Sequence, residues 1–193
     1  MELKFKKLNY VQNDKDGNPT IVESTGILPT KAHPTDAGYD LTATRITQEV
    51  DEAGKIVLVY HTDIAVELPM NTVGLIFMRS SVSKRSITSC NAVGVVDSGY
   101  RGELIVKFKV TTDALPRIYN VGEKIAQLVV VPYLNLDPIL VDELSESDRG
   151  DNGFGSTNKI KQDEHNEREL GTGDRLLQEN DPAISEQSGV CES

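Results

Sequence analysis

The sequence predicts an all-β fold of the sandwich, jelly-roll or barrel type, and two observations support this prediction. Apolar residues recur at every second position in several short segments, which is the period of a β-strand and not of a helix. Turn-forming Gly, Pro, Asn and Asp residues separate these segments at short intervals. The chain has 193 residues, of which 38% are hydrophobic, so we expect one packed core with some additional chain.

The clearest predicted strand runs from residue 104 to residue 110. One face of this strand is apolar and is expected to be buried; it consists of Leu104, Val106, Phe108 and Val110. Lys107 and Lys109 occupy part of the opposite face. Similar short segments predict further strands at residues 3–8, 56–59, 64–68, 73–77, 93–96 and 125–131.

Two shorter features complete the predicted core. The stretch NDKDGNPT at residues 13–20 is predicted to be a solvated turn, because Asn, Asp, Gly and Pro favour turns. The segment from Ser80 to Ile87 is the best helix candidate, and it would be short. Ser80 or Ser81 could accept a backbone N–H in its first turn.

The composition changes after Asn158. Residues 159–193 contain four basic and nine acidic side chains and only a scatter of Ile, Leu and Val. Such a segment cannot bury enough apolar surface to offset the entropy of ordering it. We therefore predict a mostly disordered acidic tail, with a short helix at residues 163–170 as the alternative.

The net charge of −10 argues against binding to a nucleic-acid polymer, because that binding depends on many Lys and Arg side chains that displace counterions. A single nucleotide triphosphate stays compatible with this charge, since a few basic groups and a divalent cation can offset it locally. No apolar run approaches the roughly 20 residues needed to cross a bilayer, and the N-terminus lacks a signal peptide. We therefore predict a cytoplasmic protein without a membrane segment.

The cysteines and histidines indicate neither a disulfide nor a zinc site. Cys90 and Cys191 lie in very different surroundings, which argues against a structural disulfide and fits a reducing compartment. The three histidines, His33, His61 and His165, lack metal-ligand spacing. The sequence supports no Ser-His-Asp or Cys-His pair either.

Five segments contain more Gly, Ser, Asp and Arg than a strand or a plain turn requires. In chain order they are DAGYDL at 36–41, MRSS at 78–81, NAVGVVDSGYRGE at 91–103, GEKIAQL at 122–128 and RGDNGFGST at 149–157. Together they closely resemble the five signature motifs of the trimeric dUTPase family, in the family's order, and the resemblance covers roughly residues 1–158. Each motif alone would be weak evidence, but unrelated β-proteins have no packing reason to contain all five.

The resemblance implies a jelly-roll-like β-barrel of the dUTPase family with one short helix, assembled as a homotrimer with shared active sites. It divides the chain into a barrel domain at 1–148, a Gly-rich arm at 149–158 that closes the active site, and the acidic tail at 159–193. The implied reaction is Mg²⁺-assisted, in-line attack of water on the α-phosphorus of dUTP. The products would be dUMP and pyrophosphate, and the removal of dUTP would limit uracil in DNA and supply dUMP for dTMP synthesis.

The first two segments are implied to bind magnesium and phosphates. The resemblance assigns Asp40 to a magnesium ion through its waters, whereas by itself Asp40 would more often be a surface turn residue. Arg79, Ser80 and Ser81 could cradle a phosphate at a helix start, and an N-cap beside a surface Arg is an equally good interpretation of this segment alone. The family usually has Pro before this Arg, where this chain has Met78.

The third segment is the most specific of the five. The resemblance implies a nucleoside-binding hairpin in which backbone groups, helped by Asn91 and Gly94, pair with the uracil edge. Tyr100 would pack against the sugar and exclude a 2′-hydroxyl, and its alternative role is ordinary strand packing. Asp97 would be the general base that orients the attacking water, although a turn-starting Asp would fit VVDSGYRG equally well.

The last two segments would complete the phosphate site. Gln127 is a polar residue in an apolar run and is implied to contact the phosphates and the catalytic water; the alternative is a core Gln bonded to backbone. The arm would cross to another subunit and grip the substrate through five residues, namely Arg149, Phe154, Gly155, Ser156 and Thr157. Phe154 would cover the uracil, and the arm's Arg and two hydroxyls would hold the γ-phosphate. The family often has Gly where this chain has Asn158.

Two rival functions stay open at this point. The related dCTP deaminases share the fold and have a catalytic Glu several residues after the hairpin, where this chain has Lys107. Some phage-encoded family members also bind transcriptional repressors, so a regulatory partner for this chain, with the tail as its binding segment, is the alternative from another class. If the source is viral, the protein would act in the host cytoplasm.

Overall fold

The computed structural model describes residues 2–112 and 114–151, and strands form almost all of the regular structure there. The chain divides into two units, residues 1–138 and residues 139–193. All strands belong to the first unit, and none of the described helices is long and apolar enough to span a membrane. The predicted functional boundary at residue 148 and the cytoplasmic location stay predictions, and the tail at 159–193 lies outside the described residues.

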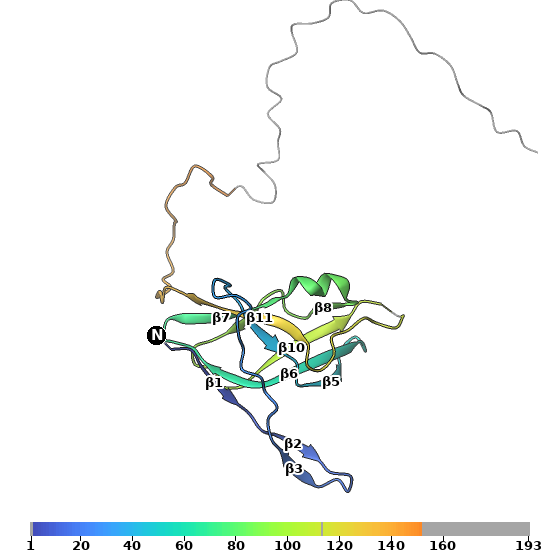
Figure 1. Ribbon diagram of the computed structural model, residues 1–193. Coiled ribbons are helices and arrows are strands. Elements are labelled where there is room, and N and C mark those ends of the chain that lie inside the picture. The colour runs from blue at the N-terminus through green and yellow to red at the C-terminus, as the bar shows by residue number, and fades with distance from the viewer. Residues whose placement is uncertain (1, 113, 152–193) are drawn as a thin grey trace, which may run out of the picture. The chain divides into compact units, whose positions relative to one another are not determined.

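The larger sheet contains five antiparallel strands (Figure 1). They are β1 (Lys4–Lys7), β5 (Arg45–Val50), β6 (Ile56–Glu67), β8 (Ile87–Ser89) and β10 (Glu103–Val110). The long strand β6 pairs with β5 along its first half and with β1 along its second half, while β10 pairs with it throughout. The register between β6 and β10 shifts between Glu103 and Ile105, which marks a bulge in β6.

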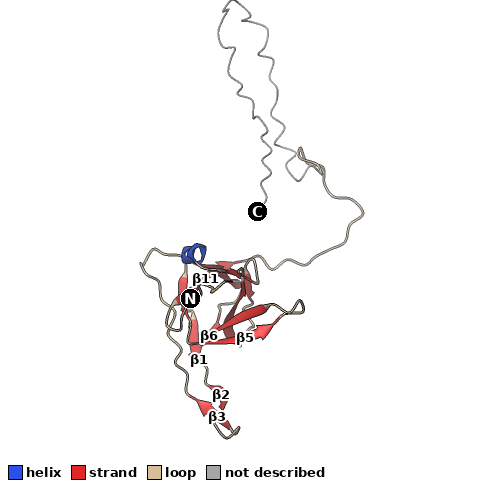
Figure 2. Cartoon of the chain, turned by 90° about the vertical axis from the view of Figure 1, so that its right-hand side faces the viewer, coloured by secondary structure: helices blue, strands red, loops and turns tan. Residues whose placement is uncertain are grey.

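The second sheet contains four antiparallel strands in the order β4-β11-β7-β9. They are β4 (Tyr39–Thr42), β7 (Thr72–Met78), β9 (Gly94–Val96) and β11 (Lys124–Pro132). A separate hairpin of β2 (Tyr10–Asn13) and β3 (Pro19–Val22) projects away from both sheets (Figures 1 and 2). The side chain of Asp14 stabilises its turn by accepting the backbone N–H groups of Asp16 and Asn18, so the predicted turn in this stretch is confirmed.

Both sheets contribute to a single core. Leu41, Ile76 and Leu128 come from the four-stranded sheet, and the largest contributions of the five-stranded sheet are Leu58, Tyr60, Leu104, Val106 and Phe108. The alternation predicted for β10 is confirmed, because its apolar side chains Leu104, Val106 and Phe108 are buried while its lysines are exposed. Burial raises the pKa of Tyr60, whose hydroxyl donates to the carbonyl of Tyr119 at 3.0 Å.

The predicted helix is shorter and of a different type than expected. Residues Ser80–Lys84 form a 3₁₀ helix, and the chain is already extended again at Arg85. Its N-cap is Arg79, and no side chain caps it, so the prediction of a serine cap was wrong. The hydroxyl of Ser81 instead bonds to the Tyr119 hydroxyl at 2.9 Å, which ties the helix to the aromatic part of the core.

Candidate active site

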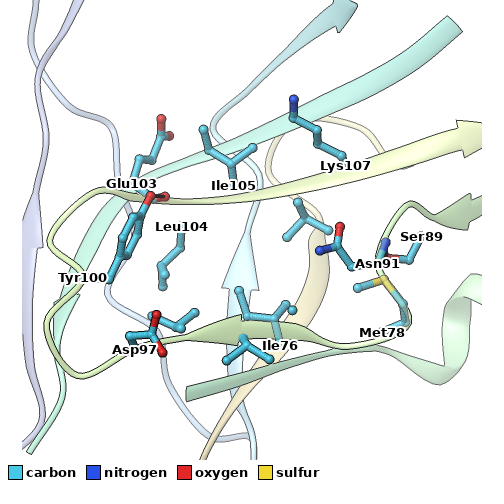
Figure 3. A pocket seen from close by; sticks show the side chains of 14 residues that line it. Ile76, Met78, Ser89, Asn91, Asp97, Tyr100, Glu103, Leu104, Ile105 and Lys107 are labelled. Atoms are coloured by element: carbon cyan, nitrogen blue, oxygen red, sulfur yellow. Dashed lines mark hydrogen bonds between the residues drawn. The ribbon is translucent and has the colours of Figure 1, made fainter. Parts of the chain in front are cut away.

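The third segment forms one wall of a pocket of about 220 Å³ between β9 and β10 (Figure 3). We call it the hairpin pocket. The four residues of this segment that were predicted to contact the substrate or water all line it, namely Asn91, Gly94, Asp97 and Tyr100. Met78 also lines it, so the residue that replaces the family's Pro lies at this pocket. In Figure 3 Asn91 lies at one end of the pocket and Tyr100 at the other.

Asp97 starts a turn, which is one of the two interpretations that its sequence context left open. It follows the last residue of β9, and its carbonyl accepts the backbone N–H of Tyr100 at 3.0 Å, which closes a turn. Its side chain is exposed and faces the pocket. The bond that closes the turn uses the Asp97 backbone and not its side chain, so the carboxylate can face a ligand.

Tyr100 is held by its hydroxyl, which donates to the carbonyl of Glu103 at 3.0 Å. A Cβ atom at Gly102 would lie only 2.4 Å from this hydroxyl, so the ring can take this position only because residue 102 is glycine. Arg101 donates to the carbonyls of Ser98 and Tyr100, at 2.7 Å each, and stiffens the same turn. The Tyr100 side chain is 45% exposed, so the packing role that was its alternative is a minor one.

A second cluster joins three other predicted residues on the four-stranded sheet. Asp40 of β4 pairs with Gln127 of β11 in the strand register, and its carboxylate lies 3.1 Å from Nε of Arg79. The other carboxylate oxygen accepts Nζ of Lys124 at 2.7 Å. Gly38 is required here as well, because a Cβ atom at that position would lie 2.6 Å from Oε1 of Gln127.

This cluster contains two cations around one carboxylate that is only 10% exposed. Its net charge is therefore positive, which suits an incoming phosphate chain. The interpretation of Asp40 as a plain surface turn residue was wrong, because Asp40 lies within β4 and is mostly covered. Lys124 was not singled out from the sequence, although it lies in the fourth segment three residues before Gln127.

The two serines of the second segment lie at the start of the 3₁₀ helix. Ser80 is exposed, and its carbonyl accepts the hydroxyl of Ser83 at 2.8 Å. Ser81 is partly buried through its bond to Tyr119. Ser80 is thus the more accessible of the two hydroxyls that the sequence assigned to phosphate.

The arm is described only at its beginning. Arg149 lies in a turn, in which Gly150 has a φ of +55° and donates to the carbonyl of Ser147 at 3.0 Å. The other predicted arm residues, Phe154, Gly155, Ser156 and Thr157, lie outside the described residues.

Most of the sequence matches a known family. The dUTPase family model matches residues 24–158. A deoxyuridine 5'-triphosphate nucleotidohydrolase of Desulfitobacterium hafniense is 39% identical over 153 residues, which cover 78% of this chain and 94% of that protein. The protein of the same name from Nocardia farcinica is 43% identical over 131 residues, covering 67% of this chain and 78% of that one.

Solved structures agree with these relatives. The dUTPase of Staphylococcus bacteriophage 80alpha, a mutant solved with dUpNHpp, has a TM-score of 0.62 and 28% sequence identity, covering 81% of this chain and 98% of that one. A mutant dUTPase from phage phi11 of S. aureus, which coordinates a structural Mg(II) ion, has a TM-score of 0.55 and 26% identity over 76% of this chain and all of that one. Sequence and fold thus agree, and this chain belongs to the dUTPase family.

Proposed function

We propose that this chain is a dUTP diphosphatase, which hydrolyses dUTP to dUMP and pyrophosphate. Such an activity limits uracil in DNA and supplies dUMP for dTMP synthesis. The observation that carries this proposal is the hairpin pocket, in which Asn91, Gly94, Asp97 and Tyr100 come together in a chain that belongs to the dUTPase family. Named relatives of the chain hydrolyse deoxyuridine 5'-triphosphate, and a similar phage enzyme was solved with dUpNHpp.

The hairpin would bind the nucleoside. Backbone groups near Gly94, together with the amide of Asn91, would pair with the donor and acceptor pattern of the uracil edge. Cytosine has the opposite pattern, so it would leave buried polar groups unpaired at a cost of about 1–3 kcal/mol each. The ring of Tyr100 would lie against the sugar and leave no room for a 2′-hydroxyl.

The Asp40 cluster would bind the phosphates. Arg79 and Lys124 carry the positive charge, and Gln127 adds a polar group at the same place on the sheet. Ser80 and Ser81 would add hydroxyl groups from the neighbouring 3₁₀ helix. Arg149, Ser156 and Thr157 of the arm would close over the γ-phosphate, with Phe154 and Gly155 over the base.

The residues present fit a magnesium ion that is held largely by the substrate. Across the described parts of the chain, no three acidic, His or Cys side chains come together as a metal cluster. Asp40 offers a single carboxylate, which suits contact with the waters of a hydrated Mg²⁺, because this ion keeps several waters and binds substrate phosphates. When bound, the ion would neutralise charge on the triphosphate.

Asp97 would act as the general base. Its carboxylate would orient a water molecule and accept a proton from it as the water oxygen bonds to the α-phosphorus. The bond from the α-phosphorus to the bridging oxygen would break, and pyrophosphate would leave with the electron pair. No covalent enzyme intermediate is needed, and the cations of the Asp40 cluster would stabilise the charge on the leaving group.

A homotrimer with shared sites would bring the separate parts together. Within one chain the end of β7 connects the hairpin pocket, which Met78 lines, with the Asp40 cluster, to which Arg79 belongs. The arm of a neighbouring subunit would complete the site. The segment that follows β11 supports self-association, because it leaves large apolar side chains exposed, namely Tyr133, Leu134, Leu136, Ile139, Leu140 and Leu144. An exposed apolar stretch of this length usually marks an interface.

The direct test is pyrophosphate release with dUTP, dCTP, dTTP and UTP side by side, each with Mg²⁺ and with excess EDTA. We expect turnover with dUTP alone, at least about 100-fold above the other nucleotides, and loss of that turnover in EDTA. The same samples should release no ammonia from dCTP. Equal turnover of all four nucleotides, or none with dUTP, would exclude the proposal.

The structure of the hairpin also argues against deamination. Lys107 lines the pocket where the deaminases have a catalytic Glu, and its Nζ is paired with Glu49 of β5 at 2.5 Å. A paired lysine cannot accept the proton that a deaminase Glu must accept.

A regulatory partner is the second candidate function. Phage dUTPases with folds similar to this one control the transfer of virulence genes, as described for the 80alpha enzyme with bound dUpNHpp. A transcriptional repressor bound by this chain would give it a comparable role, with the acidic tail as one contact. Pull-down of such a repressor by the full chain, but not by a chain ending at Asn158, would support the tail's part in it.

Cys90 provides a probe of nucleotide binding, because it directly precedes Asn91 and is exposed. Desolvation of its sulfur raises the pKa of the thiol, so the reactive thiolate is scarce at neutral pH. We expect iodoacetamide to label Cys90 more slowly than it labels N-acetylcysteine at pH 7, with a rate that rises about tenfold per pH unit below the pKa. dUpNHpp should slow this labelling, as measured by mass spectrometry of the Cys90 peptide, with the Cys191 peptide as internal control. Rapid labelling at pH 7 that ignores both pH and nucleotide would contradict this expectation.

A further inference from the structure

We infer that Glu103 is a positioning residue for sugar selection, whose buried carboxylate fixes the strand end that holds Tyr100. The inference rests on the proposed function and concerns the discrimination between dUTP and UTP. Glu103 is the first residue of β10 and lies beside Tyr100 at one end of the pocket (Figure 3). Glu103 was not among the site residues predicted from the sequence.

The link between the two residues is the hydrogen bond from the Tyr100 hydroxyl to the Glu103 carbonyl, at 3.0 Å. The ring folds back over Gly102, where a Cβ atom would lie 2.4 Å from its hydroxyl. The position of the ring therefore depends on the position of the Glu103 backbone.

The side chain of Glu103 holds that backbone through three donors. Its Oε1 accepts the backbone N–H of Asp63 at 2.8 Å. Its Oε2 accepts Nη2 of Arg45 at 3.2 Å and bonds to Nδ1 of His61 at 3.0 Å. The carboxylate is only 15% exposed, so these bonds are largely shielded from water.

Strand β6, which pairs with β10, needs the bonds from Glu103 because its backbone is irregular at Asp63. Asp63 lies in the bulge of β6 with a φ of +53°, a left-handed conformation that non-glycine residues rarely adopt. Its side chain is buried, and Oδ1 bonds to Nε of Arg45 at 3.2 Å. Oδ2 has no partner among the described residues, so Arg45 provides the bond to the Asp63 carboxylate and Glu103 the bond to its N–H, while Leu8 and Ser24 donate to its carbonyl. The ring of Tyr10 covers this cluster, with its centroid 4.4 Å from the Arg45 guanidinium carbon.

This arrangement explains why residue 103 is a carboxylate. A carboxylate has two acceptor oxygens, which match donors from three directions, whereas an amide would direct an N–H₂ group at one of those donors. Arg45 would then lose one of its two acidic partners. Rearrangement around Arg45 would shift the Glu103 carbonyl and with it the Tyr100 ring, which must lie close to the sugar to exclude a 2′-hydroxyl.

The test is Glu103→Gln, measured as kcat/KM for dUTP and for UTP on the full-length protein. We expect the dUTP-to-UTP ratio to fall about tenfold, through a gain with UTP and a higher KM for dUTP, while kcat with dUTP falls by less than the ratio does. A Glu103→Gln protein that folds and keeps the parental ratio would overturn the inference. If the parent itself does not hydrolyse dUTP, the proposed function fails instead, so the two failures are distinguishable.

A double-mutant cycle with Tyr100→Phe identifies the route of the effect. Phenylalanine lacks the hydroxyl, so Tyr100→Phe should lower the ratio by itself, and Glu103→Gln should lower it no further in that background. Additive losses would mean that Glu103 acts by another route and would refute the inference.

Two further variants distinguish a specific effect on the dUTP-to-UTP ratio from a general loss of stability. Asp51→Asn is the matched control, because Asp51 also accepts two backbone N–H groups, from Ala53 and Lys55, and pairs with Lys109 at 2.9 Å, away from the hairpin pocket. It should keep the parental ratio. If Glu103→Gln does not fold, His61→Ala removes one of the three donors and should lower the ratio about threefold; an unchanged ratio in folded His61→Ala would count against the inference.

Discussion

The Asp97→Asn variant is expected to lose about a thousandfold in kcat for dUTP hydrolysis. An asparagine amide cannot accept a proton from the attacking water, and its size and shape are nearly those of the original carboxylic group. The turn should survive, because the bond from the Tyr100 N–H goes to the backbone carbonyl of residue 97 and not to its side chain. The measurement is single-turnover pyrophosphate release at saturating dUTP.

The variant should still bind the substrate. A dissociation constant for dUpNHpp within about threefold of the parental value would locate the loss in the chemical step. Asp14→Asn is the matched control, because Asp14 is also an exposed carboxylate at a turn, but it lies on the separate β2–β3 hairpin. It should have full activity. If Asp97→Asn turned over dUTP as fast as the parent, another group would have to be the general base.

An alternation of buried and exposed side chains made a strand predictable, and a continuous apolar run did the same for β11. β10 is the best example, since its alternation of Val106 and Phe108 with exposed lysines follows the period of the pleat. β6 is covered on both faces and has no such alternation. The polar stretch around Thr62 and Asp63 was therefore interpreted as a break between two strands, and this interpretation was wrong. Those polar residues are buried because Glu103, forty residues away along the chain, accepts the backbone N–H of Asp63.

Five short strands, β2, β3, β4, β5 and β8, were not predicted at all. β5 has the sequence RITQEV, in which only Ile46 and Val50 are large and apolar, and Val50 is exposed. It becomes a strand because β6 offers a complete edge of backbone hydrogen bonds beside it. Pairing of this kind depends on the partner and cannot be inferred from the local pattern.

The candidate site could be predicted residue by residue but not as an arrangement. The hairpin residues were identified because Asn91, Asp97 and Tyr100 recur at the spacing of a known motif. The sequence could not indicate that Asp40 contacts both Arg79 and Lys124, because these residues come from three different strands or their ends. Glu103 was not predicted for a similar reason, since its partners lie on β5 and β6 and its role depends on the bulge in β6.

The arm at residues 149–158 offers the other large expected effect. The described parts of the site contain few groups for a γ-phosphate, and the arm would add a guanidinium and two hydroxyls, from Arg149, Ser156 and Thr157. Glycines between them allow the backbone to approach the phosphates closely. Closure would also exclude bulk water and hold the triphosphate for in-line attack, which are effects on positioning and charge stabilisation.

A chain truncated after Asp148 should therefore lose at least about a hundredfold in kcat/KM for dUTP, while it still folds and assembles like the parent. The assembly is checked by light scattering and the fold by the thermal unfolding transition. A chain truncated after Asn158, which lacks only the acidic tail, is the matched control and should hydrolyse dUTP at the parental rate. Because the two chains differ by ten residues alone, a difference between them would assign the loss to the arm. Full turnover by the shorter chain would mean that the phosphates are held without the arm, by Arg79, Lys124 and Gln127.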